Sequence, residues 1–163
     1  MPLADNFRVG MRRLAAGVCV VSTKVDAGRF AMTASSVTSL SDEPPSLLVC
    51  INVDAAIQSH LSRGVPFTVS VLSYEQQDVS NLCAQKEAGE ERFAIDGWAE
   101  YGEQKLPYIA GAQAIFVCEV DSDNIMYGTH QIVVGKLSEV LIPEGPVQPL
   151  IYADGAYQRI AKA

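Results

Sequence analysis

Strand-like runs follow one another along this chain with little helix between them, and this order limits the folds it can adopt. Runs rich in β-branched and apolar residues occupy positions 18–23, 29–34, 46–51, 67–72, 112–121, 129–140 and 150–152. Such side chains favour strands because they fit the pleated surface of a sheet. The pattern lacks the regular strand–helix alternation of a doubly wound parallel sheet. It predicts a mainly β fold: an antiparallel barrel with a few short flanking helices.

Three short helices are predicted from capping residues and apolar spacing. Asp5 can cap a helix over residues 6–16, and Asp54 can cap one over residues 54–61. Ser73 and Gln76 form a capping box for a helix that reaches about residue 83. The polar stretch 86–96 is expected to be a loop. The run 46–51 is apolar throughout, which predicts a strand that is buried on both faces.

Composition excludes several classes of function. A net charge of −7 without a dense cluster of Lys and Arg argues against nucleic-acid binding. No apolar run is long enough to span a bilayer, and the first residues do not resemble a signal peptide, so no membrane association is expected. The four cysteines are 31, 33 and 35 residues apart, a spacing that predicts no metal site. We expect one globular domain over residues 1–163, located in the cytoplasm with reduced thiols.

The most informative polar stretch is Thr33-Ala34-Ser35-Ser36, which lies between two predicted strands. Hydroxyl groups and the free backbone N–H groups of a turn can bind a phosphate without a lysine. An acidic chain has to hold an anionic cofactor locally in this way, with the help of one or two cations. Because the chain has no Gly-x-Gly-x-x-Gly motif, a nucleotide would be bound outside the Rossmann scheme. The alternative is a polar turn with no ligand.

Several short motifs are weak signals one by one, but their joint order and spacing along the chain are specific. They are Phe7-Arg8-x-x-Met11, the run from Met32 to Ser41, Pro44-Pro45, Cys50-Ile51-Asn52, Arg92-Phe93, Gly128-Thr129-His130 and Gly135. From Phe7 to about Tyr157, the chain resembles the short-chain flavin reductase family, whose fold is the FMN-binding split barrel. The resemblance implies a homodimeric enzyme that transfers a hydride from NAD(P)H to FMN or FAD. In many members, the reduced flavin then diffuses to a separate flavin-dependent monooxygenase.

The resemblance also implies which residues bind the flavin. The hydroxyl-rich stretch would contact the phosphate and the ribityl chain, Arg92 would hold the phosphate bidentately, and Phe93 would cover a ring. Backbone groups at the end of the strand that contains Cys50 would meet the polar edge of the isoalloxazine. The full set is Thr33, Ala34, Ser35, Ser36, Ser39, Leu40, Cys50, Ile51, Asn52, Ala55, Ala56, Ser59, Ser70, Lys86, Arg92 and Phe93.

Some of these assignments have structural alternatives. Many relatives carry Arg, Ser or Thr between positions 53 and 57, where this chain has Ala55 and Ala56, so backbone groups alone would face a phosphate there. Core packing is the alternative for Cys50 and Ile51. For Ser70 the alternative is an outward-facing strand serine. For Lys86, Arg92 and Phe93 it is a solvated, charged loop.

The nicotinamide side is implied by two further segments. His130 would lie beside the nicotinamide as the catalytic residue, although the family pattern is Gly-Asp-His and this chain has Thr129 in place of the Asp. A structural histidine is the alternative. Relatives often carry a cation where this chain has Asp154, and an acid there disfavours the 2′-phosphate of NADPH, so NADH is expected. The residues of this side are Gly128, His130, Tyr152, Ala153, Asp154, Gly155 and Tyr157.

Two other functions stay open at this level. A flavin carrier or electron-transfer protein on the same barrel would keep the phosphate segment and need no nicotinamide site. An enzyme similar to pyridoxamine-phosphate oxidase would need cations for a substrate phosphate, and this acidic chain offers few. The same barrel serves several functions, so residues and not the fold must decide among them.

Overall fold

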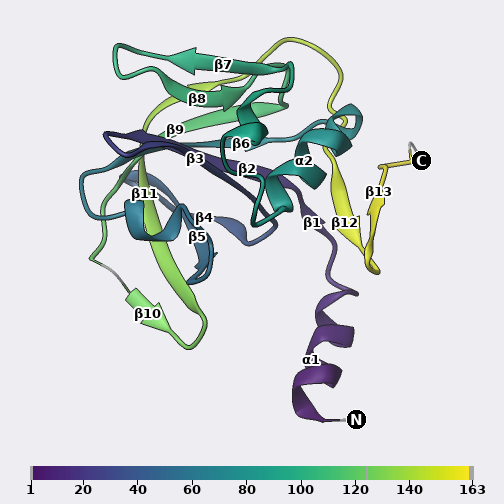
Figure 1. Ribbon diagram of the computed structural model, residues 1–163. Coiled ribbons are helices and arrows are strands. Elements are labelled where there is room, and N and C mark those ends of the chain that lie inside the picture. The colour runs from purple at the N-terminus through teal and green to yellow at the C-terminus, as the bar shows by residue number, and fades with distance from the viewer. Residues whose placement is uncertain (1, 124, 162–163) are drawn as a thin grey trace.

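The computed structural model describes residues 2–123 and 125–161, so both predicted ends of the domain lie outside the described residues. A curved antiparallel sheet forms its centre, with small hairpins and short helices around it (Figure 1). The helices are α1 (Leu3–Met11) and α2 (Gln77–Ala84), with the 3-10 helices η1 (Gln58–His60), η2 (Tyr74–Gln76) and η3 (Gly89–Phe93). The strands are β1 (Ala16–Gly17), β2 (Cys19–Val25), β3 (Gly28–Ala34), β4 (Val37–Asp42), β5 (Pro45–Asn52), β6 (Pro66–Val71), β7 (Trp98–Tyr101), β8 (Leu106–Ile109), β9 (Ala114–Val120), β10 (Ile125–Tyr127), β11 (His130–Leu141), β12 (Ile151–Ala153) and β13 (Ala156–Gln158).

The main sheet has the strand order β3-β2-β6-β9-β11-β5-β4, and β10 pairs with β11 outside this path. Every ladder is antiparallel, which confirms the predicted fold class. The inner face packs around Phe67, Val69, Val49 and Ile51, all of them fully buried. Among the described residues, no ladder joins β3 to β4, so the barrel stays open along a seam between these two edges.

The burial of strand β5 differs from the prediction. Its burial alternates, with Leu47, Val49 and Ile51 buried in the core and Leu48 and Cys50 half-buried on the opposite face. An apolar run predicted burial on both faces, but at β5 a core cluster covers only one face of the sheet. The outer face of β5 is therefore apolar without being fully covered by the described part of the chain.

Two of the predicted helices differ in the structure. The first begins three residues earlier than predicted, after Pro2, and ends at Met11 instead of residue 16. Asp5 lies inside its first turn and pairs with Arg8 at 2.9 Å. The segment predicted as a helix over residues 54–61 forms only η1, and it enters through a turn in which the Asn52 side chain accepts the Asp54 N–H. The polar stretch 86–96, expected as a loop, contains η3.

The third predicted helix is present, and its capping box forms as expected. Gln76 Oε1 accepts the Ser73 N–H at 2.9 Å, and the chain continues from η2 directly into α2. These two elements cover one end of β3 and β2. The capping interaction therefore fixes where α2 begins. It thereby helps to position α2, which forms a wall of the candidate site.

The hairpin β7–β8 has no counterpart in the sequence-based prediction, and buried hydroxyls hold it in place. Ser22 and Thr68 both donate to the Pro107 carbonyl, at 2.7 and 2.6 Å, and Ser70 accepts the Ile109 N–H at 3.1 Å. All three hydroxyl side chains are fully buried. Polar residues in the middle of β2 and β6 thus satisfy the backbone of β8, as buried polar groups must.

Candidate functional site

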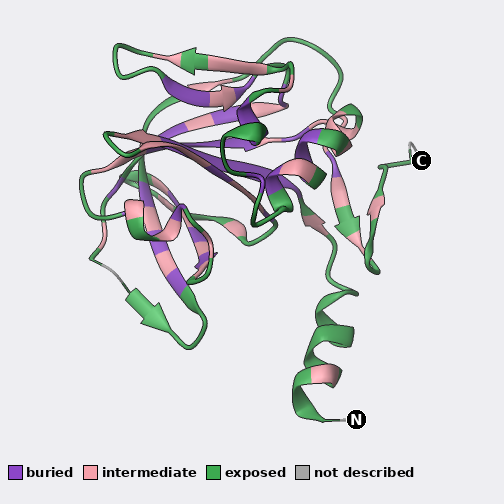
Figure 2. Cartoon of the chain, in the orientation of Figure 1, coloured by how far each residue is buried: buried purple, intermediate pink, exposed green. Residues whose placement is uncertain are grey.

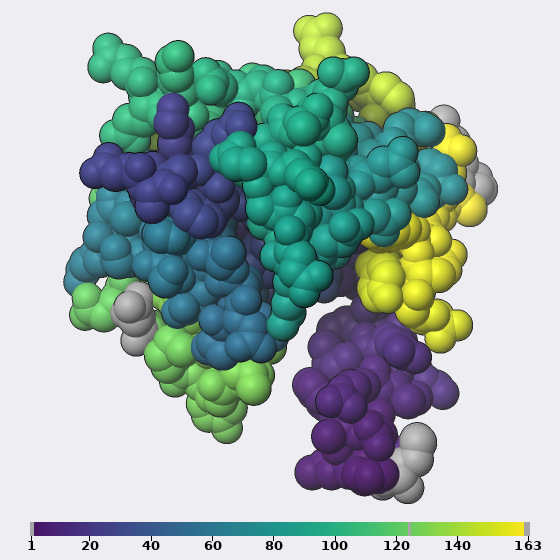
Figure 3. All heavy atoms as spheres, viewed as in Figure 1, coloured from purple at the N-terminus to yellow at the C-terminus, as the bar shows by residue number. Residues whose placement is uncertain are grey.

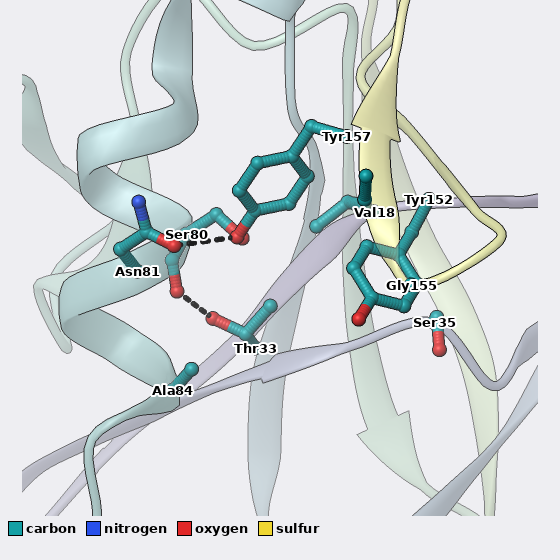
Figure 4. A pocket seen from close by; sticks show the side chains of 10 residues that line it. Val18, Thr33, Ser35, Ser80, Asn81, Ala84, Tyr152, Gly155 and Tyr157 are labelled. Atoms are coloured by element: carbon teal, nitrogen blue, oxygen red, sulfur yellow. Dashed lines mark hydrogen bonds between the residues drawn. The ribbon is translucent and has the colours of Figure 1, made fainter.

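Two cavities lie side by side between β3, α2 and the segment that follows β5, and they share Thr33 and Ala84. The larger has a volume of about 450 Å³ (Figure 4) and is lined by Val18, Thr33, Ser35, Ser80, Asn81, Ala84, Tyr152, Gly155, Ala156 and Tyr157. The smaller has a volume of about 150 Å³ and is lined by Ala31, Met32, Thr33, Asn52, Ala55, Ala56, Cys83, Ala84, Lys86 and Arg92. Both border the edge strand β3 at Thr33.

The smaller cavity contains a buried cation. Arg92 has only 6% of its surface exposed, and its Nη2 donates to the carbonyls of Gln85 and Lys86. Its Nε has no hydrogen-bond partner among the described residues. A buried guanidinium that is balanced by no carboxylate and keeps an unused donor fits an anionic ligand.

Residues at the mouth of the smaller cavity supply a second cation. Lys86 Nζ lies 3.4 Å from Asp54 Oδ2, and both side chains are largely exposed, so this ion pair is weak and can open. The Asn52 side chain fixes the adjoining turn by accepting the Asp54 N–H at 2.9 Å. The turn presents Ala55 and Ala56 to the cavity, and their small side chains leave its wall open to a ligand.

Cys83 lies in the wall of the same cavity. Burial raises the pKa of its thiol from 9.0 to about 11, and the nearby Arg92 opposes this shift only in part. The thiol therefore stays protonated at neutral pH, where it is a poor nucleophile. It contributes packing to the cavity rather than covalent chemistry.

A chain of hydrogen bonds joins the walls of the larger cavity, as Figure 4 shows in part. Thr33 Oγ1 donates to the Ser80 carbonyl at 2.6 Å, which ties β3 to α2. The Ser80 hydroxyl lies 2.7 Å from the Tyr157 hydroxyl, which in turn donates to Asn81 Oδ1 at 2.9 Å. The rings of Tyr157 and Tyr152 meet edge to face with centroids 5.8 Å apart. Three elements, β3, α2 and the β12–β13 hairpin, thus form one connected frame.

Ten of the residues predicted from the sequence line these cavities, and they come from five separate stretches of the chain. They are Thr33, Ser35, Asn52, Ala55, Ala56, Lys86, Arg92, Tyr152, Gly155 and Tyr157. The hydroxyl-rich stretch, the polar loop and the C-terminal segment are thereby brought together. Their roles in binding remain predictions.

The other predicted residues lie outside these two linings. Ser36, directly before β4, donates to the Cys50 carbonyl of β5 at 2.9 Å, and Ser70 is fully buried beneath β8. Phe93 is buried against Trp98 with ring centroids 4.5 Å apart, because it belongs to a second core cluster, which also contains Val20, Leu72 and Ile109. Neither cavity is lined by Ala34, Ser36, Ser39, Leu40, Cys50, Ile51, Ser59, Ser70, Phe93, Gly128, His130, Ala153 or Asp154.

His130 lies close to the cavities without lining either of them. It is exposed at the start of β11 and stands directly opposite Asn52 in the β11–β5 ladder. Directly opposed residues of a ladder project to the same face, so His130 is a neighbour of a residue that lines the smaller cavity. Thr129 Oγ1 lies 2.9 Å from His130 Nδ1 and supplies a partner where the family pattern has an Asp.

Sequence reasoning missed the wall that α2 contributes. Ser80, Asn81 and Ala84 line the larger cavity, but none was assigned to the site. A signal was available in the small side chains of Ser80 and Ala84, which are four residues apart and so share one face of the helix. Nothing in the sequence indicated that this face meets the C-terminal hairpin.

No helix in the described part of the chain is long and apolar enough to cross a membrane. Residues 2–123 and 125–161 contain no group of three or more His, Cys, Asp or Glu side chains that could hold a metal ion.

Comparison with known proteins places the chain in a family. The chain is 34% identical to the FMN reductase (NADH) RutF of Enterobacter cloacae over 99% of its own length and 96% of that protein. The NADH:FAD oxidoreductase SgcE6 of Streptomyces globisporus superposes with a TM-score of 0.88 at 28% identity, covering 99% of this chain and 95% of that one. The styrene monooxygenase flavin reductase SMOB of Pseudomonas putida superposes with a TM-score of 0.82 at 28% identity, covering 97% and 98%. Residues 11–161 match the flavin reductase like domain, and the chain belongs to this family.

Proposed function

We propose that this flavin reductase binds the phosphate end of FMN or FAD in the smaller cavity and delivers the reduced flavin to a separate monooxygenase. Membership in the family makes the chain an NADH-dependent flavin reductase. Bound flavin would supply the chemistry, which is the acceptance of a hydride from NADH. The protein has to bind both partners, orient them and exclude water.

The observation that carries this proposal is the buried guanidinium of Arg92, which lines the smaller cavity and pairs with no carboxylate among the described residues. A flavin phosphate would balance its charge, and Lys86 would add a second charge once it leaves Asp54. The larger cavity, of about 450 Å³, offers room for the ring system and for the nicotinamide. The two cavities share Thr33, so one extended molecule can occupy both.

The direct test is NADH oxidation at 340 nm with FMN, FAD or riboflavin as acceptor. We expect flavin-dependent oxidation with NADH, and at least about ten-fold lower kcat/KM with NADPH, because Asp154 in the exposed C-terminal hairpin repels a 2′-phosphate. Flavin binding, followed by quenching of flavin fluorescence, without oxidation of either nucleotide would favour the carrier function instead.

The cellular context follows from chemistry and from relatives. We propose a cytoplasmic location because all four cysteines are free thiols. We propose a monooxygenase as the consumer of reduced flavin because SMOB is the flavin reductase of a styrene monooxygenase. Oxygenation of an added substrate by such an oxygenase, with this protein and NADH as the sole source of reduced flavin, tests the assignment.

We also propose a homodimer, because the outer face of the sheet carries a continuous apolar surface. Leu48 stands opposite Val134, and Cys50 stands opposite Ile132, which also pairs with Ile125 of β10. The first four are half-buried and Ile125 is exposed. A second copy would cover this outer face, and the resulting interface would end beside Asn52 and His130, at the edge of the candidate site.

Helix α1 supports the same proposal. It stands away from the body of the molecule, as Figures 2 and 3 show, and none of its residues is buried. Leu3, Phe7 and Met11 are spaced four residues apart and so form one apolar stripe, in which Phe7 is 64% exposed. A nine-residue helix is marginal in water on its own, so this stripe needs a partner surface.

The dimer is tested by replacing Ile132 with glutamate at the centre of the outer face. Light scattering should give the wild type a mass of twice 17.5 kDa, and Ile132→Glu should shift it to 17.5 kDa because a buried, unpaired charge is costly in an interface. Ile142→Glu is the matched control, because Ile142 is 75% exposed in a loop away from this face and the variant should stay dimeric. A monomeric wild type at micromolar concentration would contradict the proposal.

A further inference from the structure

The C-terminal hairpin has few attachments to the rest of the fold. Strand β12 forms two ladder pairs with β1, and β13 pairs only with β12 among the described residues. Further backbone bonds run from the Asp154 N–H at the hairpin turn to the Arg12 carbonyl, and from Leu150, directly before β12, to Val18 and Leu72. A hairpin this short is not stable by itself, so the position of β13 depends on side-chain contacts.

Tyr157 provides the link between β13 and α2. Its hydroxyl donates to Asn81 Oδ1 at 2.9 Å, so the Ser80 hydroxyl, at 2.7 Å, is the donor that remains to fill its acceptor site. Ser80 is fully buried, which removes competition from water on that side. Both partners come from consecutive residues of α2, so they fix the tyrosine at one position along the helix.

Ser80 bonds to Tyr157 and to Thr33 through different atoms, so the tyrosine link and the contact with the flavin side of the site are independent. Its backbone carbonyl accepts from Thr33, which lines both cavities, whereas its side chain contacts Tyr157, which lines only the larger cavity. The two attachments use different atoms of one residue. Loss of the tyrosine link therefore leaves the bond between Thr33 and α2 intact.

We infer that Tyr157 is a positioning residue for NADH, held in place by Ser80 and Asn81, and that it sets the width of the larger cavity by fastening the β12–β13 hairpin to α2. The inference rests on the proposed function. NADH, bound against the two tyrosine rings, would need the hairpin at a fixed distance from α2. Flavin would be held chiefly by its phosphate at Arg92 in the smaller cavity, which none of Tyr157, Ser80 and Asn81 lines, so its affinity would depend on this link much less.

The test uses Tyr157→Phe, Asn81→Leu and the double variant. Each single change should raise the KM for NADH and the Kd for NAD⁺ together, by about five- to ten-fold, because Asn81→Leu removes one hydrogen bond of the link and Tyr157→Phe removes both. The kcat at saturating NADH and the Kd for FMN should stay within about two-fold. The KM and Kd of the double variant should equal those of Tyr157→Phe alone, because Asn81 acts through Tyr157.

Tyr74→Phe is the matched control, because Tyr74 packs beneath Arg159 and lines neither cavity of the site. Additive effects in the double variant would show that Asn81 contacts the ligand directly and would overturn the inference. So would an unchanged KM for NADH in Tyr157→Phe, or a parallel loss of FMN affinity. If the wild type itself shows no flavin-dependent NADH oxidation, the proposed function fails instead, and this outcome is distinct from the others.

Discussion

Replacing Arg92 with methionine should weaken FMN binding by about ten- to one-hundred-fold, the range for loss of a charge-assisted hydrogen bond. Arg92 is the buried cation of the smaller cavity, and its Nε is the donor without a partner among the described residues. Methionine keeps most of the volume of the side chain while removing the charge. Titration of flavin fluorescence with FMN and with riboflavin measures the effect.

Riboflavin is the internal control, because it has the ring and the ribityl chain but no phosphate. Its affinity should change little in Arg92→Met, and an equal loss for both flavins would show that Arg92 acts through the fold. Arg29→Met is the matched variant: this cation stacks on Phe93 and pairs with Glu90 at 2.6 Å, but lines neither cavity. It should bind FMN as the wild type does.

Replacing Gly135 with valine should destabilise the protein by about 3 kcal/mol or more, at the upper end of overpacking effects in cores. A Cβ at this position would lie 2.5 Å from Phe67 Cζ and 3.2 Å from Cys118 Cβ. Phe67 is fully buried and surrounded by the core, so it cannot move aside cheaply. Urea unfolding followed by circular dichroism measures the loss of stability.

Gly17→Val is the control for the glycine substitution. A Cβ at Gly17 in β1 would meet nothing within 4 Å, and valine favours extended backbone. This variant should unfold within about 0.5 kcal/mol of the wild type, the usual range for surface changes. A Gly135→Val protein that is as stable as the wild type would show that β11 can shift away from Phe67.

The strands were predictable because their chemistry is local. The stretches that became β2, β3, β6, β9 and β11 carry β-branched and apolar side chains, and the order of these stretches excluded a parallel sheet. The hairpin β7–β8 was not predictable, because its stability comes from contacts distant in sequence. Pro107 accepts from Ser22, which is 85 positions away, and no local pattern reports such a bond.

The residues of the candidate site also divide into those with a local sequence signal and those that depend on tertiary contacts. Thr33, Asn52 and Arg92 were identified through short motifs, and the structure brings all three to one cavity. Ser70 was considered for the flavin because it lies in a strand at a plausible register, whereas its hydroxyl is used by the backbone of β8. Ser80 and Asn81 were missed because their importance depends on where the C-terminal hairpin meets α2, which is a tertiary contact.

The open seam between β3 and β4 has a consequence for the amount of the protein in the cell. Thr33 belongs to β3, one edge of the seam, and lines both cavities, so a flavin bound there would bridge β3 to parts of the chain that no ladder joins to it. A ligand that binds only the folded state shifts the folding equilibrium towards that state. Degradation acts on the unfolded fraction, so the steady-state amount of this protein should rise and fall with the supply of its own flavin.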